Sequence, residues 1–358
     1  MNIDRLELQT KLQTVAPALA DNDLVPVLTH YLFTGKRLLA YNDRIALSVP
    51  LDLDFKGTVE GKLMLDYVTM CTHAKTATLG ADNGRARLAL GKSQFRLETK
   101  PADAFTFAMP AMPKPSEGVL NADAFFPALD NCLFSTASSA TVNEQLGVTF
   151  IPNGSKVRMF ATDLKSLSYA QLPLPQLGLK EKAIVPTEFC RQMLALKDAQ
   201  RKQLVMRSDH ALFIADDTVL FGRVLRSDTN QINFDRALKN SLPANFPNGM
   251  AKMDERGRQH DRLKTTFAMA ARLYDIKGNV VNTTITVRDN IVRMEALSPR
   301  GDARDQIKLD FHPAVEAKVN ASLVKAGYDR YKRIQITDRC TLLADDADSL
   351  CIVTHMTT

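Results

Sequence analysis

Two residue patterns in this sequence could do chemistry, and the first resembles a phosphate-binding loop. Gly91-Lys92-Ser93 has the ending of a loop in which backbone N–H groups cradle a phosphate and a lysine reaches it. That motif requires a glycine five residues upstream, where Ala86 stands. The surrounding residues alternate as in a β-hairpin and do not lead into a helix. We therefore reject a nucleotide-binding loop.

Two acidic pairs, Asp216-Asp217 and Asp345-Asp346, have the residue type for metal binding or acid–base catalysis. They occupy corresponding places in two similar segments, where Asp is favoured because its side chain hydrogen-bonds to nearby backbone in turns. The six histidines show no metal-ligating spacing, and no G-x-S-x-G nucleophile elbow is present. We therefore expect no enzyme activity, no metal site and no cofactor.

The composition is that of a globular protein with a modest positive charge. The 358 residues are 45% hydrophobic and 24% charged, with a net charge of +6. This charge permits contact with a polyanion, but the absence of tryptophan and 7% aromatic content disfavour stacking on single-stranded bases. Five cysteines lack C-x-x-C spacing, and neither a signal peptide nor a transmembrane run is present. We expect a cytoplasmic protein with buried free thiols and no membrane partner.

The strongest signal is internal repetition, with a spacing of roughly 120 residues. Three segments alternate apolar and polar residues in short runs separated by turns, which predicts three-stranded meanders. These segments are 77–99, 203–225 and 333–356. A helical stretch precedes each meander, at 61–75, 186–200 and 320–331.

Each repeat also opens with a helical stretch, at 5–19, 121–137 and 261–275, and has further strands in between, at 37–49, 156–172 and 290–311. This order predicts an α+β fold of three repeated domains, each with two helices packed on antiparallel sheets. Linker-like stretches at 108–118 and 240–250 place the domains at 1–112, 113–238 and 239–358. Sheets that continue across these boundaries and close through a symmetric dimer would leave no edge exposed.

The predicted helices carry many of the basic residues. A ring lined by such helices would have a positive bore around a DNA duplex, with salt-dependent phosphate contacts and no reading of base sequence. For any single residue, an ordinary solvated helix face stays an open alternative. The predicted DNA-facing residues are Arg5, Lys11, Lys62, Lys75, Arg191, Lys197, Arg201, Lys202, Arg262, Lys264, Lys325, Arg330 and Lys332.

This arrangement resembles the β subunit of bacterial DNA polymerase III, the β sliding clamp family, over almost the whole chain. The longest matching stretch is GVTFIPNGSKVRMFATDLKSLSYAQL at 147–172. Shorter matches are PVLTHYLF (26–33), the family's first strand after the opening helix, PADAF (101–105), KAIVPTEFCRQML (182–194), LKTTFAMAARL (263–273) and the tail CIVTHMTT (351–358).

The resemblance implies a head-to-tail homodimer that closes as a six-domain ring around double-stranded DNA. It implies a clamp loader that opens the ring and no catalytic site. It also implies that DNA polymerase and other partners dock through short clamp-binding peptides, in a pocket between the second and third domains. Such a pocket would receive aliphatic and aromatic anchors.

Carried over by position, the resemblance assigns residues to two interfaces. The peptide pocket would contain Thr149, Thr162, Leu164, Leu167, Arg236, Ala237, Asn320, Leu323, Ile352, Val353 and Met356. Phe105 and Leu273 fall at the family's dimer interface. For each of these two, a core residue of its own domain is the alternative.

The sequence departs from the family at three places. LKSL stands at 164–167 where the family usually has Gly-His-Arg-Leu, and THMT stands at 354–357 where the tail commonly reads Met-Pro-Met-Arg. Asn22 occupies a loop that often carries a DNA-contacting arginine, and the basic net charge is unusual for the family. We expect the pocket to prefer a different peptide. A divergent clamp encoded by a phage or another mobile element would explain these departures.

The sequence thus predicts a DNA sliding clamp, a processivity factor that acts by encircling DNA and tethering a polymerase. The alternative is a clamp-fold interaction module that binds partner peptides without closing on DNA. Ring closure distinguishes these two functions.

Overall fold

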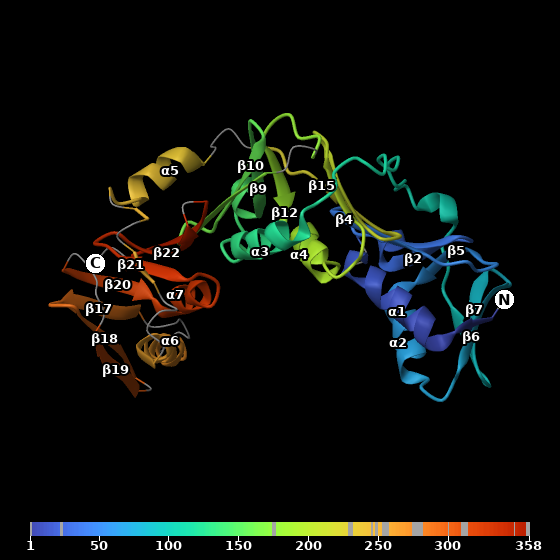
Figure 1. Ribbon diagram of the computed structural model, residues 1–358. Helices are drawn as coiled ribbons and strands as arrows, with labels where there is room; N and C mark the ends of the chain where they lie inside the picture. Colours follow the sequence, from blue (N-terminus) through green and yellow to red (C-terminus); the bar gives the residue numbers. More distant parts are fainter. Residues whose placement is uncertain are drawn as a thin grey trace. The chain divides into compact units, whose positions relative to one another are not determined.

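The computed structural model describes residues 2–21, 24–173, 177–227, 232–244, 246–247, 250–252, 258–273, 282–299, 301–308, 314–346 and 348–355. The chain forms two compact units (Figure 1). Unit 1 contains Met1–Ala122, Gln176–Lys180 and Glu188–Leu225, and unit 2 contains Asp123–Pro175, Glu181–Thr187 and Arg226–Thr358.

The predicted repetition is confirmed, because the described elements follow one order three times: a helix, four strands, a helix and three strands. After β1 (Asn2–Asp4), the first repeat contains α1 (Arg5–Val15), β2 (His30–Thr34), β3 (Arg37–Tyr41), β4 (Ile45–Pro50), β5 (Lys56–Glu60), α2 (Gly61–Met70), β6 (Thr76–Asp82), β7 (Arg85–Leu90) and β8 (Ser93–Leu97). The second contains α3 (Ala122–Leu133), β9 (Gly147–Asn153), β10 (Lys156–Thr162), β11 (Ser166–Pro173), β12 (Ala183–Pro186), α4 (Thr187–Ala195), β13 (Lys202–Met206), β14 (His210–Ala215) and β15 (Thr218–Arg223). The third contains α6 (Arg258–Ala270), β17 (Asn282–Arg288), β18 (Ile291–Ser298), β19 (Gly301–Lys308), β20 (Val315–Asn320), α7 (Ala321–Tyr328), β21 (Arg333–Ile336), β22 (Cys340–Asp346) and β23 (Ser349–Thr354).

Each unit contains one long antiparallel sheet, and the two long sheets have the same build. In unit 1 the strand order is β13-β14-β15-β4-β3-β2-β5. In unit 2 it is β21-β22-β23-β11-β10-β9-β12, with β16 (Ala251–Lys252) beside β21. The three closing strands of one repeat therefore join the four opening strands of the repeat before it, through β15–β4 and β23–β11. The sheets continue from repeat to repeat as expected, whereas the boundaries at 112 and 238 stay a prediction.

One face of each long sheet carries helices and the other carries the segment that links two repeats. In unit 1, Gly222 of β15 lies under α4, where an added Cβ would meet the Phe189 ring at 2.4 Å. The next residue back, Phe221, points to the opposite face. There it packs with Phe105, and with Phe107 at 4.9 Å between ring centroids. The linker aromatics thus close the helix-free face of unit 1.

The corresponding face of unit 2 is covered by α5 (Phe234–Ser241). Phe234 stacks on Phe160 of β10 with ring centroids 4.7 Å apart. We call this buried group the α5 cluster; it contains Phe160, Leu167, Tyr169, Phe234, Met250, Cys340, Leu342, Ala344, Leu350 and Ile352. The opposite face of the same sheet packs on the core beneath α6 and α7.

The structure corrects three details of the sequence prediction. The stretch 26–33 begins with a 3-10 turn, η2 (Pro26–Thr29), before β2, since Pro26 cannot donate to a strand ladder. Helix α5 was not predicted at all. Asp345 and Asp346 lie at the end of β22, which has a bulge between Ala344 and Asp346, and they do not form the turn itself.

The expected buried thiols and one of the expected acidic turns are present in the described residues. Asp216 has a φ of 53°, as the turn interpretation predicts, but its carboxylate accepts the backbone N–H groups of Gln200 and Arg201 just before β13. These bonds join two segments and are not local to the turn. All five cysteines are buried free thiols. The described part of the chain contains no cluster of three or more metal-ligating side chains. In the same residues, no helix is long and apolar enough to cross a membrane.

Candidate peptide and DNA interfaces

The turn between β10 and β11 brings the first residues of the predicted peptide pocket together. The Thr162 hydroxyl donates to the Ser166 carbonyl at 2.7 Å and accepts the Leu164 N–H at 3.0 Å. The Asp163 carboxylate accepts the N–H groups of Lys165 at 3.0 Å and Ser166 at 2.7 Å. Such local hydrogen bonds define an Asx turn. The turn is therefore held by its own side chains and presents Leu164 outward.

Leu164 is unusual in both conformation and exposure. Its φ is +68°, and its side chain is 65% exposed. The left-handed conformation costs an L-residue with a Cβ about 1–2 kcal/mol, a cost that glycine avoids. Residues held in such conformations concentrate at binding sites. Leu164 thus offers an apolar contact surface at a position whose backbone favours glycine.

The long sheet of unit 2 brings a second group of pocket residues together. Leu167 of β11 lies opposite Ile352 of β23, so both point to the same face. Both are buried in the α5 cluster, and Ala237 of α5 packs against it. Arg236 is exposed beside Ala237 on the same helix. Thr149 pairs with Phe160 across β9 and β10 and therefore faces the α5 cluster too.

The remaining predicted pocket residues lie elsewhere or outside the described residues. Val353 follows Ile352 in β23, so it faces the opposite side and joins the core against which Leu323 packs. The Asn320 side chain accepts the Leu323 N–H at 3.2 Å and caps α7. Met356 lies outside the described residues. The structure therefore divides the predicted pocket between the two faces of one sheet.

Sequence reasoning missed the contribution of α5 to this region. Phe234 is its buried anchor, and Asp235 forms an ion pair with Arg158 of β10. The signal was present in the sequence, because Asn233 is a preferred N-cap and Asp235 is an acidic first-turn residue. The segment is only eight residues long, which is too short to show a clear helical repeat of apolar residues.

The C-terminal strand is tied to the same turn. The Thr354 hydroxyl donates to the Lys165 carbonyl at 2.9 Å, as does the Thr354 N–H. His355 lies within 3.0 Å of the Thr341 hydroxyl through Nε2. Burial lowers the pKa of His355, although the nearby Asp338 opposes that shift. The tail is thus held against β11 and β22 by His355 and Thr354.

Two of the predicted DNA-facing cations are held by bonds within unit 1. Arg5 is only 7% exposed, and its guanidinium donates to the carbonyls of Ala74 and Val68, both at 3.0 Å. The Lys11 ammonium donates to the Pro50 carbonyl at 2.8 Å. The structure assigns Arg5 a structural role, and we remove it from the proposed DNA-facing set.

Several other predicted DNA-facing cations lie within 4 Å of a carboxylate. Asp329 lies 2.6 Å from the Lys264 ammonium and 2.7 Å from that of Lys325. Burial alone would raise the pKa of Asp329, but hydrogen bonds from these lysines outweigh it and hold the pKa below its usual range. Further pairs are Arg262 with Asp305, Arg330 with Asp130, Lys62 with Asp21 and Arg201 with Asp217.

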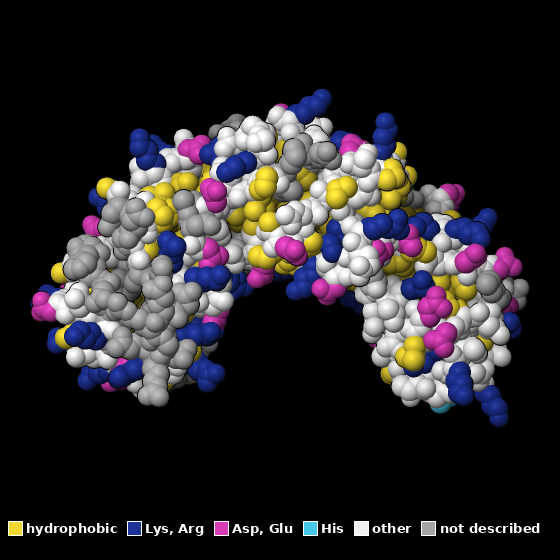
Figure 2. Space-filling view, viewed as in Figure 1, with side chains coloured by type: hydrophobic (Ala, Val, Ile, Leu, Met, Phe, Trp, Pro, Cys, Tyr) yellow, Lys and Arg dark blue, Asp and Glu magenta, His cyan; other side chains and the backbone are white. Residues whose placement is uncertain are grey.

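The rest of the set is less constrained. Lys202 donates to the Lys197 carbonyl at 3.0 Å. Four exposed cations have no ion-pair partner among the described residues: Lys75, Arg191, Lys197 and Lys332. Figure 2 shows basic and acidic side chains interspersed on the visible face. Asn22 lies outside the described residues, so its place relative to these cations is not described.

The two predicted dimer-interface residues are not freely exposed. Phe105 is buried among the linker aromatics of unit 1, as its alternative assignment to a domain core anticipated. Leu273 is half-buried and packs against the core beneath α6. A subunit interface built on these residues stays a prediction.

Comparison with known proteins identifies the fold. No family model matches the sequence. The chain is 22% identical over 316 residues to the β sliding clamp of Vibrio cholerae, covering 85% of this chain and 82% of that protein. It is 24% identical over 300 residues to the β sliding clamp of Synechococcus elongatus, covering 79% and 76%.

Solved structures agree over the full length. A sliding clamp (DNA polymerase III subunit beta) from Bartonella birtlesii, solved with griselimycin, aligns with a TM-score of 0.84 at 16% identity, covering 100% of this chain and 99% of that one. A DNA polymerase III beta subunit from Thermotoga maritima aligns with a TM-score of 0.79 at 15% identity and the same coverage. The chain therefore has the sliding-clamp fold and is similar in sequence, at low identity, to bacterial β sliding clamps.

Proposed function

We propose that this protein is a cytoplasmic DNA sliding clamp, which encircles duplex DNA as a homodimeric ring and tethers a DNA polymerase without catalysing a reaction. The observation that carries this proposal is the rule by which the repeats join. Twice within the chain, the last closing strand of one repeat pairs antiparallel with an opening strand of the preceding repeat. The full-length likeness to sliding clamps supports the same function.

The same rule predicts how two copies meet. β8 is the closing strand at the edge of the sheet β1-β6-β7-β8, and β19 is the opening strand at the edge of β19-β18-β17-β20. They correspond to β15 and β4, and to β23 and β11, in the long sheets. Pairing β8 of one copy with β19 of another would continue the pattern head to tail. Two such junctions close a ring and cover both edges.

Crosslinking tests this pairing. Gln94 of β8 and Arg304 of β19 are both exposed, and the native cysteines are buried. They correspond to Val219 and Ser48, which pair across β15 and β4. The double substitution Gln94→Cys with Arg304→Cys should give a disulfide-linked dimer under oxidation, because paired strands bring Cβ atoms within bonding reach. Asp302→Cys and Gln306→Cys, each combined with Gln94→Cys, cover the neighbouring registers. Each single variant is the control and should stay uncrosslinked.

Solution mass gives the complementary measurement. Light scattering at micromolar concentration should give about twice 39.7 kDa. Retention on circular DNA and loss from linear DNA would then show encirclement. A monomer at all concentrations, with no crosslinked species in any register, would contradict the ring.

We also propose that partner peptides dock on unit 2 at the β10–β11 turn. Leu164 would supply the exposed apolar contact, backed by the half-buried Ala237 and the buried Leu167 and Ile352. The exposed Lys165 and Arg236 would supply positive charge at the rim. This charge favours peptides with acidic residues beside the apolar anchor. The other predicted members, Thr149, Thr162, Asn320, Leu323, Val353 and Met356, would act from the surrounding strands and helix.

One observation favours the second candidate, an interaction module that does not close on DNA. Ion pairs or backbone hydrogen bonds occupy Arg5, Lys11, Arg262, Lys264 and Lys325. This reduces the charge available for phosphates. Peptide binding by a monomer without retention on circular DNA would select this function.

A further inference from the structure

The turn between β3 and β4 in unit 1 has the same construction as the β10–β11 turn in unit 2. The Asn42 side-chain oxygen accepts the N–H groups of Arg44 at 3.1 Å and Ile45 at 2.9 Å. Asp43 has a φ of 72°, close to the 68° of Leu164. The backbone bond that closes each turn also corresponds, with Asn42 N to Ile45 O at 3.2 Å and Asp163 N to Ser166 O at 3.3 Å. Because β3 and β4 correspond to β10 and β11, the turns occupy equivalent places in the two sheets.

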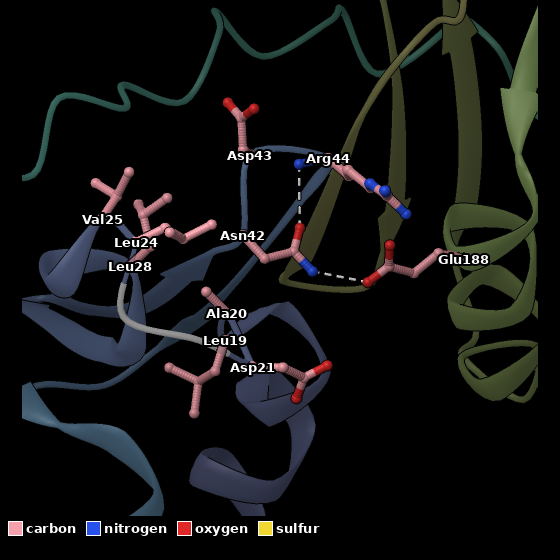
Figure 3. A pocket seen from close by; sticks show the side chains of 10 residues that line it. All are labelled: Leu19, Ala20, Asp21, Leu24, Val25, Leu28, Asn42, Asp43, Arg44 and Glu188. Carbon is pink, nitrogen blue, oxygen red and sulfur yellow. Dashed lines mark hydrogen bonds between the residues drawn. The ribbon is translucent and has the colours of Figure 1, made fainter.

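A cavity of about 410 Å³ opens beside the unit 1 turn (Figure 3). This volume lies within the range of ordinary ligand pockets. One side of the cavity is apolar, and the other is formed by the turn and the first turn of α4. Its lining residues are Leu19, Ala20, Asp21, Leu24, Val25, Leu28, Asn42, Asp43, Arg44 and Glu188.

The apolar side contains side chains that the core does not cover. Leu24 is 85% exposed and Val25 is 52% exposed, whereas Leu28 behind them is buried. Figure 3 shows these three side chains grouped on one side of the cavity, across from Asn42. Adjacent large apolar side chains left in water are a common mark of a binding surface.

The polar side is rigid and mainly acidic. The Asn42 amide donates to the Glu188 carboxylate at 2.7 Å and so fixes the turn to α4. Three carboxylates line the cavity, those of Asp21, Asp43 and Glu188, against the single guanidinium of Arg44. Asp21 lies 3.7 Å from Lys62 and Asp43 lies 3.1 Å from Arg223, but both ion pairs are exposed and therefore weak. Glu188 is bonded to the neutral Asn42 amide and has no ion-pair partner among the described residues. In a chain with a net charge of +6, this acidic cavity runs against the overall charge.

We propose that this cavity is a second peptide-binding site, which takes an extended segment with an aliphatic side chain next to a lysine or arginine. The aliphatic group would lie against Leu24, Val25 and Leu28, and the cation would face Asp21 and Glu188. The choice of a peptide as the occupant rests on the proposed function of the equivalent turn in unit 2. The preference for a basic residue rests on the charges of unit 1 alone.

Methyl NMR on the full-length protein tests the proposal with two defined probes. The acetylated, amidated peptides GSKLRLKSG and GSELELESG have the same apolar residues and opposite charge. The basic peptide should shift the methyl signals of Leu24, Val25 and Leu28, with a dissociation constant of roughly 1 mM or below. The acidic peptide should leave these signals in place.

Matched variants separate a specific site from loose association. Leu24→Ser should weaken binding of the basic peptide about tenfold, because it removes an exposed apolar contact without disturbing the core. Leu6→Ser is the control, since Leu6 of α1 is 60% exposed and does not line the cavity. Asp21→Asn should weaken binding severalfold, with a smaller loss at high salt.

The unit 2 methyl signals separate this inference from the proposed function. A response at Leu164, Leu167 or Ile352 to the acidic peptide, with no response at Leu24 or Val25 to the basic one, would overturn the second site and leave the first. Basic-peptide shifts that persist unchanged in Leu24→Ser would also overturn it. A response at the cavity alone would support the second site and count against the peptide region of unit 2.

Discussion

The β3–β4 turn of unit 1 and the β10–β11 turn of unit 2 share one hydrogen-bond scheme but differ in what they present. At the left-handed position unit 1 has Asp43, a residue type that tolerates this conformation, and unit 2 has Leu164, which does not. Asp43 pairs with Arg223 at 3.1 Å, whereas the Leu164 side chain is exposed. The turn backbone therefore belongs to the repeated fold, whereas the side chain at its tip differs between the two units.

The two long sheets also differ in what covers their outer face: α5 in unit 2 and the linker aromatics in unit 1. Substituting the aromatic residues of these covering segments should give the largest changes in stability. Phe234→Ala should destabilise unit 2 by about 3–5 kcal/mol, because it empties a buried site stacked on Phe160. Phe107→Ala should cost unit 1 only about 1–2 kcal/mol, since Phe107 is half-buried against Tyr41. Hydrogen exchange, resolved by unit, measures both.

Equal losses in the two variants would mean that α5 covers its face no more tightly than the linker of unit 1. Phe55→Ala is a useful further control, because Phe55 packs edge-on against Phe33 within unit 1, with ring centroids 5.5 Å apart. It should leave hydrogen exchange in unit 2 unchanged.

Substitution of the residue at the tip of the turn should give the next largest effect. It should raise the stability of unit 2 but weaken peptide binding. Leu164→Asn should stabilise unit 2 by about 1 kcal/mol, because asparagine tolerates a positive φ. The same change should weaken binding of the acidic peptide severalfold, because the exposed apolar side chain is lost. Thermal unfolding and peptide titration measure the two effects.

Asp43→Asn in unit 1 is the matched control at the equivalent position. It should give no comparable gain in stability, since aspartate already tolerates the conformation and its exposed ion pair contributes little. If Leu164→Asn gains stability and binds peptide as tightly as before, the strained leucine has no role in binding.

How far the sequence could predict these regions depends on the range of the interactions. The alternating strands and amphipathic helices were readable, because burial on one face imposes a local period on the residues. The split of Ile352 and Val353 between two faces also follows from strand alternation, once the register with Leu167 is known. Nothing local in the sequence supplies that register, because it pairs residues far apart in the chain.

The sequence also could not show which basic residues are exposed and which are already bonded, because their partners lie far away in the chain. Arg5 lies on a helix like any exposed cation, yet the carbonyls that bind it come from Val68 and Ala74. Lys264 of α6 is likewise paired with Asp329, which caps the C-terminal end of α7. A helical period identifies a polar face, but only tertiary structure decides which cations on it are already paired.

The predicted DNA-facing cations differ between the units in how many are already paired with a carboxylate. Lys75, Arg191 and Lys197 of unit 1 are exposed, while Lys264 and Lys325 of unit 2 share Asp329. Asp329→Asn should therefore free two lysines and steepen the salt dependence of DNA binding by up to about two units of log–log slope. Lys197→Ala should reduce that slope by about one unit.

Asp338→Asn is the matched control for net charge. Asp338 is exposed and pairs only loosely with the adjacent Arg339, at 3.8 Å. It should change DNA binding far less than Asp329→Asn does. Equal effects from both aspartates would show that net charge, and not the release of these lysines, governs binding.

The smallest expected effect is the acid sensitivity of the unit 2 tail. Burial lowers the pKa of His355 below its unfolded value of 6.5, so protonation favours the unfolded state. The stability from this residue is therefore fully present above about pH 6.5 and is lost as the pH falls through the lower folded pKa.

His355→Gln should remove this part of the pH dependence of the unit 2 melting temperature between pH 7.5 and 5.5. Burial also lowers the pKa of His30 in unit 1, so that unit should keep its acid sensitivity in the variant. An unchanged pH profile for unit 2 in His355→Gln would show that its acid sensitivity arises from other groups.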